Sequence, residues 1–317
     1  MRDIGTPVYR PAGDCIWNSF QNSGRRHLIL TGSRGSGKST LLARLFPDAP
    51  GLTTWAEPGK AVYLRENATG ETALAGFFDP DIPGSENRMR PKKEAFRDLG
   101  TAALARCARG ESSWVSIDEI GYLECGCPEY YGAVLDLMEK KRVAAVIRKQ
   151  ELPFLTELCS RPDVFCVDLD QPFGQLGCVI MASGLGKRFG GGKLLAQLEG
   201  KPLIEWTLDA TEGIFRRRIV VTRHREVEAL CREREVPALL HNQPFRSDTI
   251  RLGLEALEKG AELLEACVFC PADQPLLRKE TLASLALCAS GTKKGQEKAL
   301  IWRPAFGEKA GSPVLFP

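Results

Sequence analysis

Residues 177–195, GCVIMASGLGKRFGGGKLL, decide the fold of the second half of this chain. The four residues after Gly177 are apolar and predict a short buried strand. The strand opens into a glycine-rich loop that carries Lys187, Arg188 and Lys193. Glycine allows tight turns that bring backbone N–H groups close to an anion, and the basic side chains add positive charge. The pattern therefore predicts a strand followed by a loop that binds a chain of phosphates.

A dinucleotide-binding turn is the alternative interpretation, because Gly184 and Gly186 begin the pattern G-x-G-x-x-G. The third glycine, Gly190, falls one position late. The next predicted strand, residues 219–222, ends in Thr222 and is followed by Arg223, where a dinucleotide site needs an acid for the ribose. Three cations also suit a triphosphate better than a hydride-transfer cofactor. We therefore favour a nucleoside triphosphate as the ligand.

The same loop resembles the signature L-A-A-G-x-S-x-R-M-G-x-x-K of the nucleotidyltransferases that include molybdenum cofactor cytidylyltransferase and guanylyltransferase. Gly184, Arg188, Gly190 and Lys193 match it, whereas Gly186 stands for the serine and lacks the hydroxyl that could reach a phosphate. The resemblance implies that Arg188 and Lys193 act on the reacting phosphates. It also implies that CTP or GTP is bound by Ala182, Ser183, Gly184, Arg188, Gly190 and Lys193.

The first half carries a separate phosphate-binding motif. Residues 32–39, GSRGSGKS, fit G-x-x-x-x-G-K-[ST] and lie between a predicted strand and a predicted helix, which is the context of a P-loop. Backbone N–H groups of such a loop face the phosphates of ATP or GTP. We expect Lys38 to reach the β- and γ-phosphates and the Ser39 hydroxyl to bind Mg²⁺. The predicted binding residues are Gly32, Ser33, Arg34, Gly35, Ser36, Gly37, Lys38, Ser39 and Thr40.

A second apolar strand, residues 114–117, runs directly into Asp118 and Glu119. We expect Asp118 to hold the magnesium ion through water, and Glu119 to orient or deprotonate the attacking water. Two adjacent carboxylates after a strand favour hydrolysis over phosphoryl transfer to an alcohol. In the alternative, Glu119 is a surface acid beside a purely structural Asp118.

Residues 117–124, IDEIGYLE, are similar to the D-E-I-G-x-M-E signature of a small P-loop nucleoside-triphosphatase family of thermophiles and vertebrates. The similarity extends from about residue 26 to residue 170. It implies slow hydrolysis of several nucleoside triphosphates with poor base selectivity. Arg148, which follows another predicted strand, either approaches the phosphates or is a surface cation.

An acid of the second half lies at the end of the apolar strand 266–271. Strands of an α/β sheet place their ligands at their carboxyl ends, and Asp273 comes there, in the sequence Asp-Gln-Pro. By resemblance to the transferases, Asp273 binds a Mg²⁺ ion that bridges the triphosphate. Residues 311–316 resemble the G-x-P-V-L-F strand of that family, whose members continue beyond the position of Pro317. We therefore expect a C-terminally truncated transferase domain.

Length and composition are consistent with two domains. The chain has 317 residues, more than the ~100–200 of one typical domain, and 43% hydrophobic residues. A net charge of only +3 argues against a nucleic-acid partner, and the lack of a long apolar window argues against a membrane protein. Eleven cysteines spread through apolar runs fit a reducing compartment. We expect a cytoplasmic protein.

The expected fold class is α/β, with two domains that are each a mainly parallel sheet flanked by helices. We expect an N-terminal extension over residues 1–25 that lies against the first domain. A P-loop nucleoside-triphosphatase domain follows over residues 26–171, and residues 172–177 form a linker. A Rossmann-like nucleotidyltransferase domain then covers residues 178–317.

The two resemblances together imply a bifunctional nucleotide enzyme. Its first domain hydrolyses nucleoside triphosphate, and its second transfers a nucleotidyl group from CTP to molybdopterin cofactor, releasing pyrophosphate. A molybdenum hydroxylase apo-enzyme is the candidate protein partner. The alternative is a nucleotide-driven delivery protein or chaperone for molybdenum cofactor, whose transferase-like domain binds the cofactor without transferring anything to it.

Overall fold

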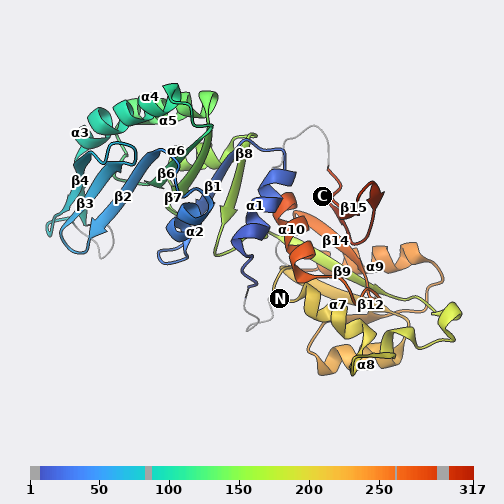
Figure 1. Ribbon diagram of the computed structural model, residues 1–317. Helices are drawn as coiled ribbons and strands as arrows, with labels where there is room; N and C mark the ends of the chain where they lie inside the picture. Colours follow the sequence, from blue (N-terminus) through green and yellow to red (C-terminus); the bar gives the residue numbers. More distant parts are fainter. Residues whose placement is uncertain (1–7, 83–87, 261–262, 291–299) are drawn as a thin grey trace. The chain divides into compact units, whose positions relative to one another are not determined.

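The computed structural model describes residues 8–82, 88–260, 263–290 and 300–317, and the chain divides into two compact units. One unit is Ser23–Gln171, which we call the P-loop unit. The other combines Met1–Asn22 with Pro172–Pro317, and we call it the composite unit. Each unit is built on its own sheet, coloured along the sequence in Figure 1.

The P-loop unit contains a sheet with the strand order β5-β4-β3-β2-β6-β7-β1-β8. The part from β2 to β8 is parallel, and β3, β4 and β5 extend it in antiparallel fashion. The strands are β1 (His27–Thr31), β2 (Gly51–Glu57), β3 (Ala61–Glu66), β4 (Thr72–Phe78), β5 (Met89–Pro91), β6 (Trp114–Ile120), β7 (Arg142–Ile147) and β8 (Val164–Asp168).

Helices cover both faces of the parallel part of this sheet. Figure 1 shows α4 and α5 on one face and α2 on the other. The core lies between the sheet and α4 and α5, where Ile117 and Ala145 pack with Leu104 and Leu137. Parallel strands buried on both faces read as continuous apolar runs, as β1 and β7 do here. The helices are α2 (Lys38–Leu45), α3 (Lys93–Ala95), α4 (Thr101–Arg109), α5 (Pro128–Lys140) and α6 (Pro153–Ser160), with a π-helical turn at Phe96–Gly100.

The composite unit contains a second sheet, with the order β13-β12-β9-β14-β17. It is parallel except for β17 at one edge. Gly253 lets α9 lie close to this sheet, because a Cβ atom there would come within 2.5 Å of Val179 Cγ1. The elements are β9 (Leu176–Ala182), α7 (Leu203–Thr211), β12 (Arg217–Thr222), α8 (Arg225–Glu233), β13 (Ala238–Leu240), α9 (Arg246–Glu258), β14 (Ala266–Pro271), α10 (Lys279–Ser290) and β17 (Val314–Phe316). The α/β class and the two mainly parallel, helix-flanked sheets are therefore confirmed.

Local structure differs from the prediction after the glycine-rich loop of the composite unit. The apolar residues at 194, 195 and 198 predict a helix that starts at residues 194–198. Instead, a short 3₁₀ turn (Lys193–Leu195) leads into a hairpin of β10 (Gln197–Leu198) and β11 (Lys201–Pro202). The two residues between these strands, Glu199 and Gly200, both have positive φ, as a tight hairpin turn requires. A second small hairpin joins β15 (Ala305–Phe306) to β16 (Lys309–Ala310).

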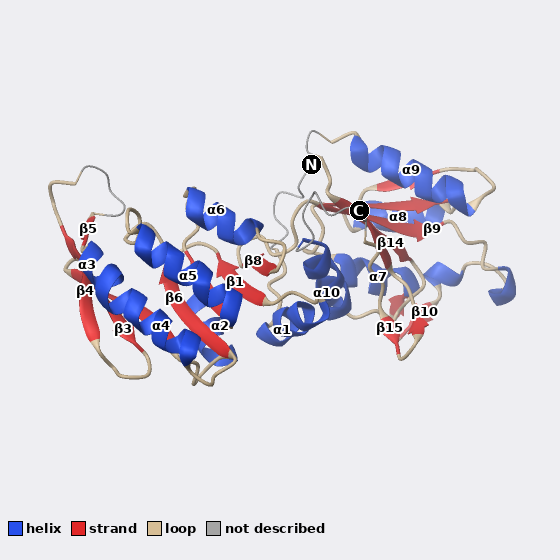
Figure 2. Ribbon diagram, turned by 90° about the horizontal axis from the view of Figure 1, so that it is seen from above, coloured by secondary structure: helices blue, strands red, loops and turns tan. Residues whose placement is uncertain are grey.

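The predicted place of the N-terminal extension is wrong for its described residues 8–22, while residues 1–7 lie outside the described part. Helix α1 (Gly13–Asn22) packs against α10 of the composite unit, as Figures 1 and 2 both show. Ile16 and Phe20 are fully buried, and the Ser19 hydroxyl donates a hydrogen bond to Ser284 Oγ at 3.3 Å. Ile16 and Phe20 cover the apolar face of α10. In the sequence, the P-loop unit therefore lies between the two segments that form the composite unit.

This insertion predicts which unit depends on α1. Replacing Phe20 with alanine leaves a cavity beside α10, and we expect a loss of about 3–5 kcal/mol in the stability of the composite unit. Amide hydrogen exchange followed by mass spectrometry should speed up across α10 and β9 and stay unchanged across β1 and β6. Asn18→Ala, an exposed position on the same helix, is the control. Faster exchange in the P-loop unit alone would contradict the assignment of α1.

Candidate active sites

The P-loop connects β1 to the first turn of α2. Gly37 adopts a left-handed conformation, with φ of 91°, directly before the helix begins at Lys38. The Lys38 ammonium donates hydrogen bonds to the carbonyl oxygens of Gly32 and Ser33, at 3.0 and 2.9 Å. The Ser36 hydroxyl is buried and has no hydrogen-bond partner among the described residues. A buried hydroxyl without a partner, beside the N-terminus of a helix, suits an anionic ligand.

Two oxygen-bearing side chains meet where the P-loop faces β6. The Ser39 hydroxyl donates a hydrogen bond to Asp118 Oδ1 at 3.0 Å. Burial raises the pKa of Asp118, and the hydrogen bond from Ser39 partly offsets that rise. A hydroxyl and a carboxylate are ligands that Mg²⁺ accepts, so these residues fit the ion. The described ranges contain no group of three or more His, Cys, Asp or Glu side chains that could hold a metal ion.

Glu119 is held in place by two neighbours at the end of β6. Its backbone N–H donates a hydrogen bond to Thr54 Oγ1 at 2.9 Å, and Arg148 Nε donates to its carboxylate. The guanidinium carbon of Arg148 also lies 5.2 Å from the centre of the Tyr122 ring. That Arg148 approaches the phosphates or is a surface cation stays a prediction, to which the structure adds this contact. In this structure Arg148 fixes the orientation of the Glu119 carboxylate.

A third carboxylate, Glu124, was not predicted as a site residue. It is almost completely buried and accepts a hydrogen bond from the Gly121 N–H at 2.8 Å. Burial raises its pKa to about 7. Gly121 in turn packs against Arg148, because a Cβ atom there would lie 2.9 Å from Arg148 Cδ. Glu124 therefore stabilises the turn against which Arg148 rests, and its place at the end of the D-E-I-G-like signature was the available sequence signal.

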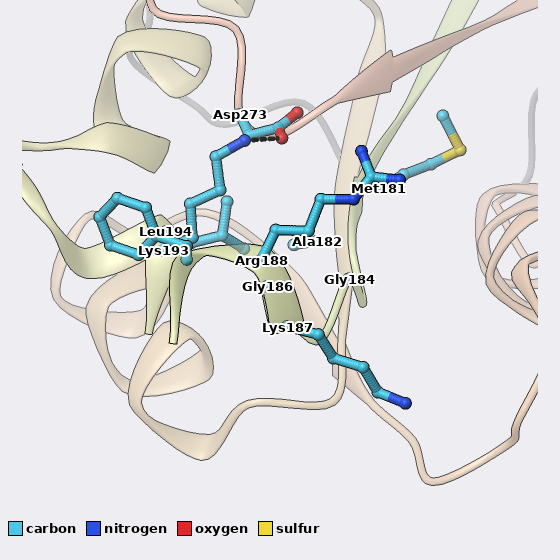
Figure 3. A pocket seen from close by; sticks show the side chains of 10 residues that line it. Met181, Ala182, Gly184, Gly186, Lys187, Arg188, Lys193, Leu194 and Asp273 are labelled. Carbon is cyan, nitrogen blue, oxygen red and sulfur yellow. Dashed lines mark hydrogen bonds and ion pairs between the residues drawn. The ribbon is translucent and has the colours of Figure 1, made fainter. Parts of the chain in front are cut away.

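A pocket of about 540 Å³ opens at the carboxyl ends of β9 and β14 in the composite unit (Figure 3). These strands are parallel neighbours with Met181 opposite Pro271, so the loops that follow them meet at one edge of the sheet. One loop supplies the cations and the other supplies Asp273. The lining residues are Met181, Ala182, Gly184, Gly186, Lys187, Arg188, Phe189, Lys193, Leu194 and Asp273.

Two of the predicted charged residues of this pocket, Lys193 and Asp273, form an ion pair. Lys193 Nζ lies 2.5 Å from Asp273 Oδ2, and Figure 3 shows the lysine pointing toward the aspartate while Lys187 points away from that pair. Both side chains remain more than one-third exposed. Asp273 thus offers a carboxylate to the pocket and fits a Mg²⁺ ion, provided that the ion displaces Lys193 from it.

Two of the predicted ligand-binding residues do not line the pocket. Ser183 bridges β9 to its neighbours, since its hydroxyl lies 3.1 Å from the Val221 carbonyl oxygen and 2.7 Å from His241 Nε2. The Gln243 N–H donates to His241 Nδ1, so the ring proton lies on Nε2 and is donated to Ser183. Gly190 ends the 3₁₀ turn Lys187–Phe189 in a left-handed conformation. The sequence did not single out Met181 and Leu194 as lining residues, because strand and turn geometry decides which apolar side chains face the ligand.

The comparisons with known proteins found relatives for both halves of the chain. A family model described as "MobA-like NTP transferase domain" matches residues 178–317. A nucleoside-triphosphatase THEP1 from Thermotoga sp. (strain RQ2) is 28% identical over 151 residues, which cover 45% of this chain and 86% of that relative. The chain thus combines a region similar to THEP1 with a region that matches the MobA-like NTP transferase domain model.

Further similarities were found for each half. A probable molybdenum cofactor guanylyltransferase from Bacillus licheniformis is 31% identical over 107 residues, which cover 34% of this chain and 53% of the relative. The chain thus spans about half the length of that guanylyltransferase. The crystal structure of THEP1 from Aquifex aeolicus has a TM-score of 0.40 and 20% identity, covering 45% of this chain and 89% of that one. In the described ranges, none of the helices combines the length and apolar character needed to cross a membrane.

The buried Glu124 of the THEP1-like region predicts a pH dependence of stability. Its pKa is about 7 in the folded protein against an ordinary value of 4.5. Between these values the folded protein binds a proton that the unfolded chain has lost. The free energy of unfolding should therefore fall as pH rises through this window, by about 3 kcal/mol in total.

Glu124→Gln removes the titrating proton and keeps an oxygen that can accept the Gly121 N–H. As the pH rises from about 4.5 to 7.5, the free energy of unfolding of this variant, measured in urea relative to wild type, should increase by the same ~3 kcal/mol. A difference that stays constant with pH would show that Glu124 ionises at its ordinary value.

Proposed function

We propose that the chain is a bifunctional nucleotide enzyme of the cytoplasm. Its P-loop unit hydrolyses nucleoside triphosphates, and its composite unit transfers a nucleotidyl group to molybdopterin cofactor with release of pyrophosphate. The Lys193–Asp273 pair carries the transfer proposal, because a cation and a metal-binding acid meet in one pocket at the carboxyl ends of parallel strands. The similarity to THEP1 carries the hydrolysis proposal.

In the hydrolysis reaction, the P-loop amides bind the phosphates and Lys38 moves from the carbonyls of Gly32 and Ser33 onto the β- and γ-phosphates. Ser39 and Asp118 would hold Mg²⁺, which supplies charge neutralisation. Glu119, oriented by Arg148, accepts a proton from the water that attacks the γ-phosphorus. The bond between that phosphorus and the oxygen that bridges the β- and γ-phosphates breaks, and orthophosphate and nucleoside diphosphate are released.

In the transfer reaction, an oxygen of the terminal phosphate of the cofactor attacks the α-phosphorus of the bound triphosphate. The bond between the α-phosphorus and the oxygen that bridges the α- and β-phosphates breaks, and negative charge develops on the leaving pyrophosphate. Lys193 and Arg188, which both line the pocket, would stabilise this charge. Asp273 would hold Mg²⁺, which supplies further charge stabilisation at the same phosphates.

The base of the transferred nucleotide is either cytosine or guanine. The Asp-Gln-Pro segment and the segment at residues 311–316 led to the prediction of CTP. The name of the Bacillus licheniformis relative supports GTP instead. Both nucleotides, with molybdopterin cofactor as the acceptor and a molybdenum hydroxylase apo-enzyme as the protein that receives the product, therefore belong in the proposal.

A delivery protein or chaperone that binds molybdenum cofactor without transfer is the second candidate. Gly186 favours it, because this residue lines the pocket and has no hydroxyl to donate to a phosphate. The two candidates differ in whether nucleotide becomes covalently attached to the cofactor.

Two variants test the proposed activities in one assay. With α-³²P-labelled CTP or GTP, Mg²⁺ and molybdenum cofactor, Asp273→Ala should lower label transfer about 100-fold or more, since it removes a metal-binding charge. Lys38→Ala should lower orthophosphate release from unlabelled ATP or GTP to a similar extent. Each variant is the control for the other, because each should keep the activity of the remaining unit. Binding of cofactor by wild type without any label transfer would favour the delivery protein.

A further inference from the structure

A carboxylate outside the predicted motif contacts the start of the P-loop. Asp170 accepts two hydrogen bonds from Ser33, one from the backbone N–H to Oδ2 at 2.7 Å and one from the hydroxyl to Oδ1 at 2.9 Å. Both carboxylate oxygens are thus used on a single P-loop residue. A bidentate, charge-assisted contact of this kind is among the stronger hydrogen bonds of a protein.

The register of the sheet explains why Asp170 reaches this position. Strands β1 and β8 are parallel neighbours, and Thr31 at the end of β1 lies opposite Asp168 at the end of β8. The Leu169 N–H continues the pairing with a hydrogen bond to the Thr31 carbonyl oxygen at 2.8 Å. The segments that follow β1 and β8 therefore leave the sheet next to each other, and Asp170 reaches the P-loop there.

Lys149 compensates the charge of this carboxylate. Its ammonium lies 2.7 Å from Asp168 Oδ2 and 3.2 Å from Asp170 Oδ2. Burial raises the pKa of Asp170, but the hydrogen bonds from Ser33 and Lys149 outweigh burial and bring the pKa below its ordinary value. Asp170 is therefore ionised at neutral pH, and Lys149 offsets a charge that would otherwise repel a triphosphate.

Ser33 also connects Asp170 to Lys38. The N–H and hydroxyl of Ser33 are bound by Asp170, while its carbonyl oxygen accepts a hydrogen bond from Lys38 Nζ at 2.9 Å. The preceding residue, Gly32, lies close to Ser36 and Asp170. A Cβ atom at this position would lie 2.8 Å from Ser36 Oγ and 3.5 Å from Asp170 Oδ1. Asp170 thus fixes the peptide groups on which the Lys38 ammonium rests.

We propose that Asp170 is a positioning residue for nucleoside-triphosphate hydrolysis, acting on Lys38 through Ser33. This inference rests on the proposed hydrolysis. Without the carboxylate, Ser33 and its carbonyl are free to shift, and Lys38 approaches the β- and γ-phosphates from a less defined position. Misplacement of a catalytic group by about 1 Å lowers a rate by as much as about 100-fold. The loss should appear mainly in kcat, because Lys38 acts most strongly on the charge that develops in the transition state.

The experiment measures orthophosphate release by the full chain from ATP and GTP. Asp170→Ala should lower kcat by about 10- to 100-fold and change KM by less than about threefold. Asp170→Asn keeps the shape and one acceptor oxygen, so it should recover part of that loss. Glu157→Gln, an exposed acid on α6, is the matched control and should behave as wild type.

Hydrogen exchange in the nucleotide-free protein separates positioning from unfolding. The inference expects faster exchange in Asp170→Ala at residues 33–38 and unchanged exchange across β6 and β7. Faster exchange throughout the P-loop unit, or a wild-type kcat in Asp170→Ala, would overturn it. A wild-type chain that releases no orthophosphate would instead overturn the hydrolysis proposal, and the inference with it.

Discussion

The parallel register of neighbouring strands is the constraint on which both sites depend. Strands that run in the same direction end at the same edge of their sheet, so residues far apart in the chain meet there. In the composite unit, β9 and β14 bring the cationic loop to Asp273. In the P-loop unit, β1 and β8 bring the P-loop to Asp170, and β6 delivers Asp118 to Ser39. Each glycine-rich loop is therefore completed by an acid from another strand.

In both units, several charged groups of the candidate sites already have partners in the ligand-free protein. Lys193 is paired with Asp273, Glu119 with Arg148, and Lys38 rests on carbonyl oxygens. An unpaired charge as buried as that of Lys38 would cost several kcal/mol, whereas the more exposed Lys193–Asp273 pair contributes about 1 kcal/mol or less. Under the proposed function, a triphosphate with its cation would take the place of these partners. The geometry of the sites can thus be kept without ligand, while the partners are exchanged when it arrives.

The sequence was sufficient for those features that depend on local pattern. Local sequence was enough to predict the two glycine-rich loops and the acids Asp118, Glu119 and Asp273. Each of them is marked by a strand pattern and a turn or acidic residue directly beside it in the chain. The partners of these groups depend on strand register instead. The contacts of Arg148 with Glu119 and of Asp170 with Ser33 cross 29 and 137 residues of sequence, and no local periodicity reports them. The hairpin after Lys193 was missed because apolar residues at 194, 195 and 198 suit a helix as well as a turn and a strand.

The place of α1 has a consequence for the order in which the chain acquires its structure during synthesis. The partners of Ser19 on α10 are encoded about 265 residues later, after the whole P-loop unit has left the ribosome. Until then, the apolar side chains of Ile16 and Phe20 have no surface to cover. Contacts between such distant segments form late and slowly, and exposed apolar helices attract chaperones or aggregate. The inserted unit can complete its sheet first, so that docking of the first helix onto the last long one closes the fold.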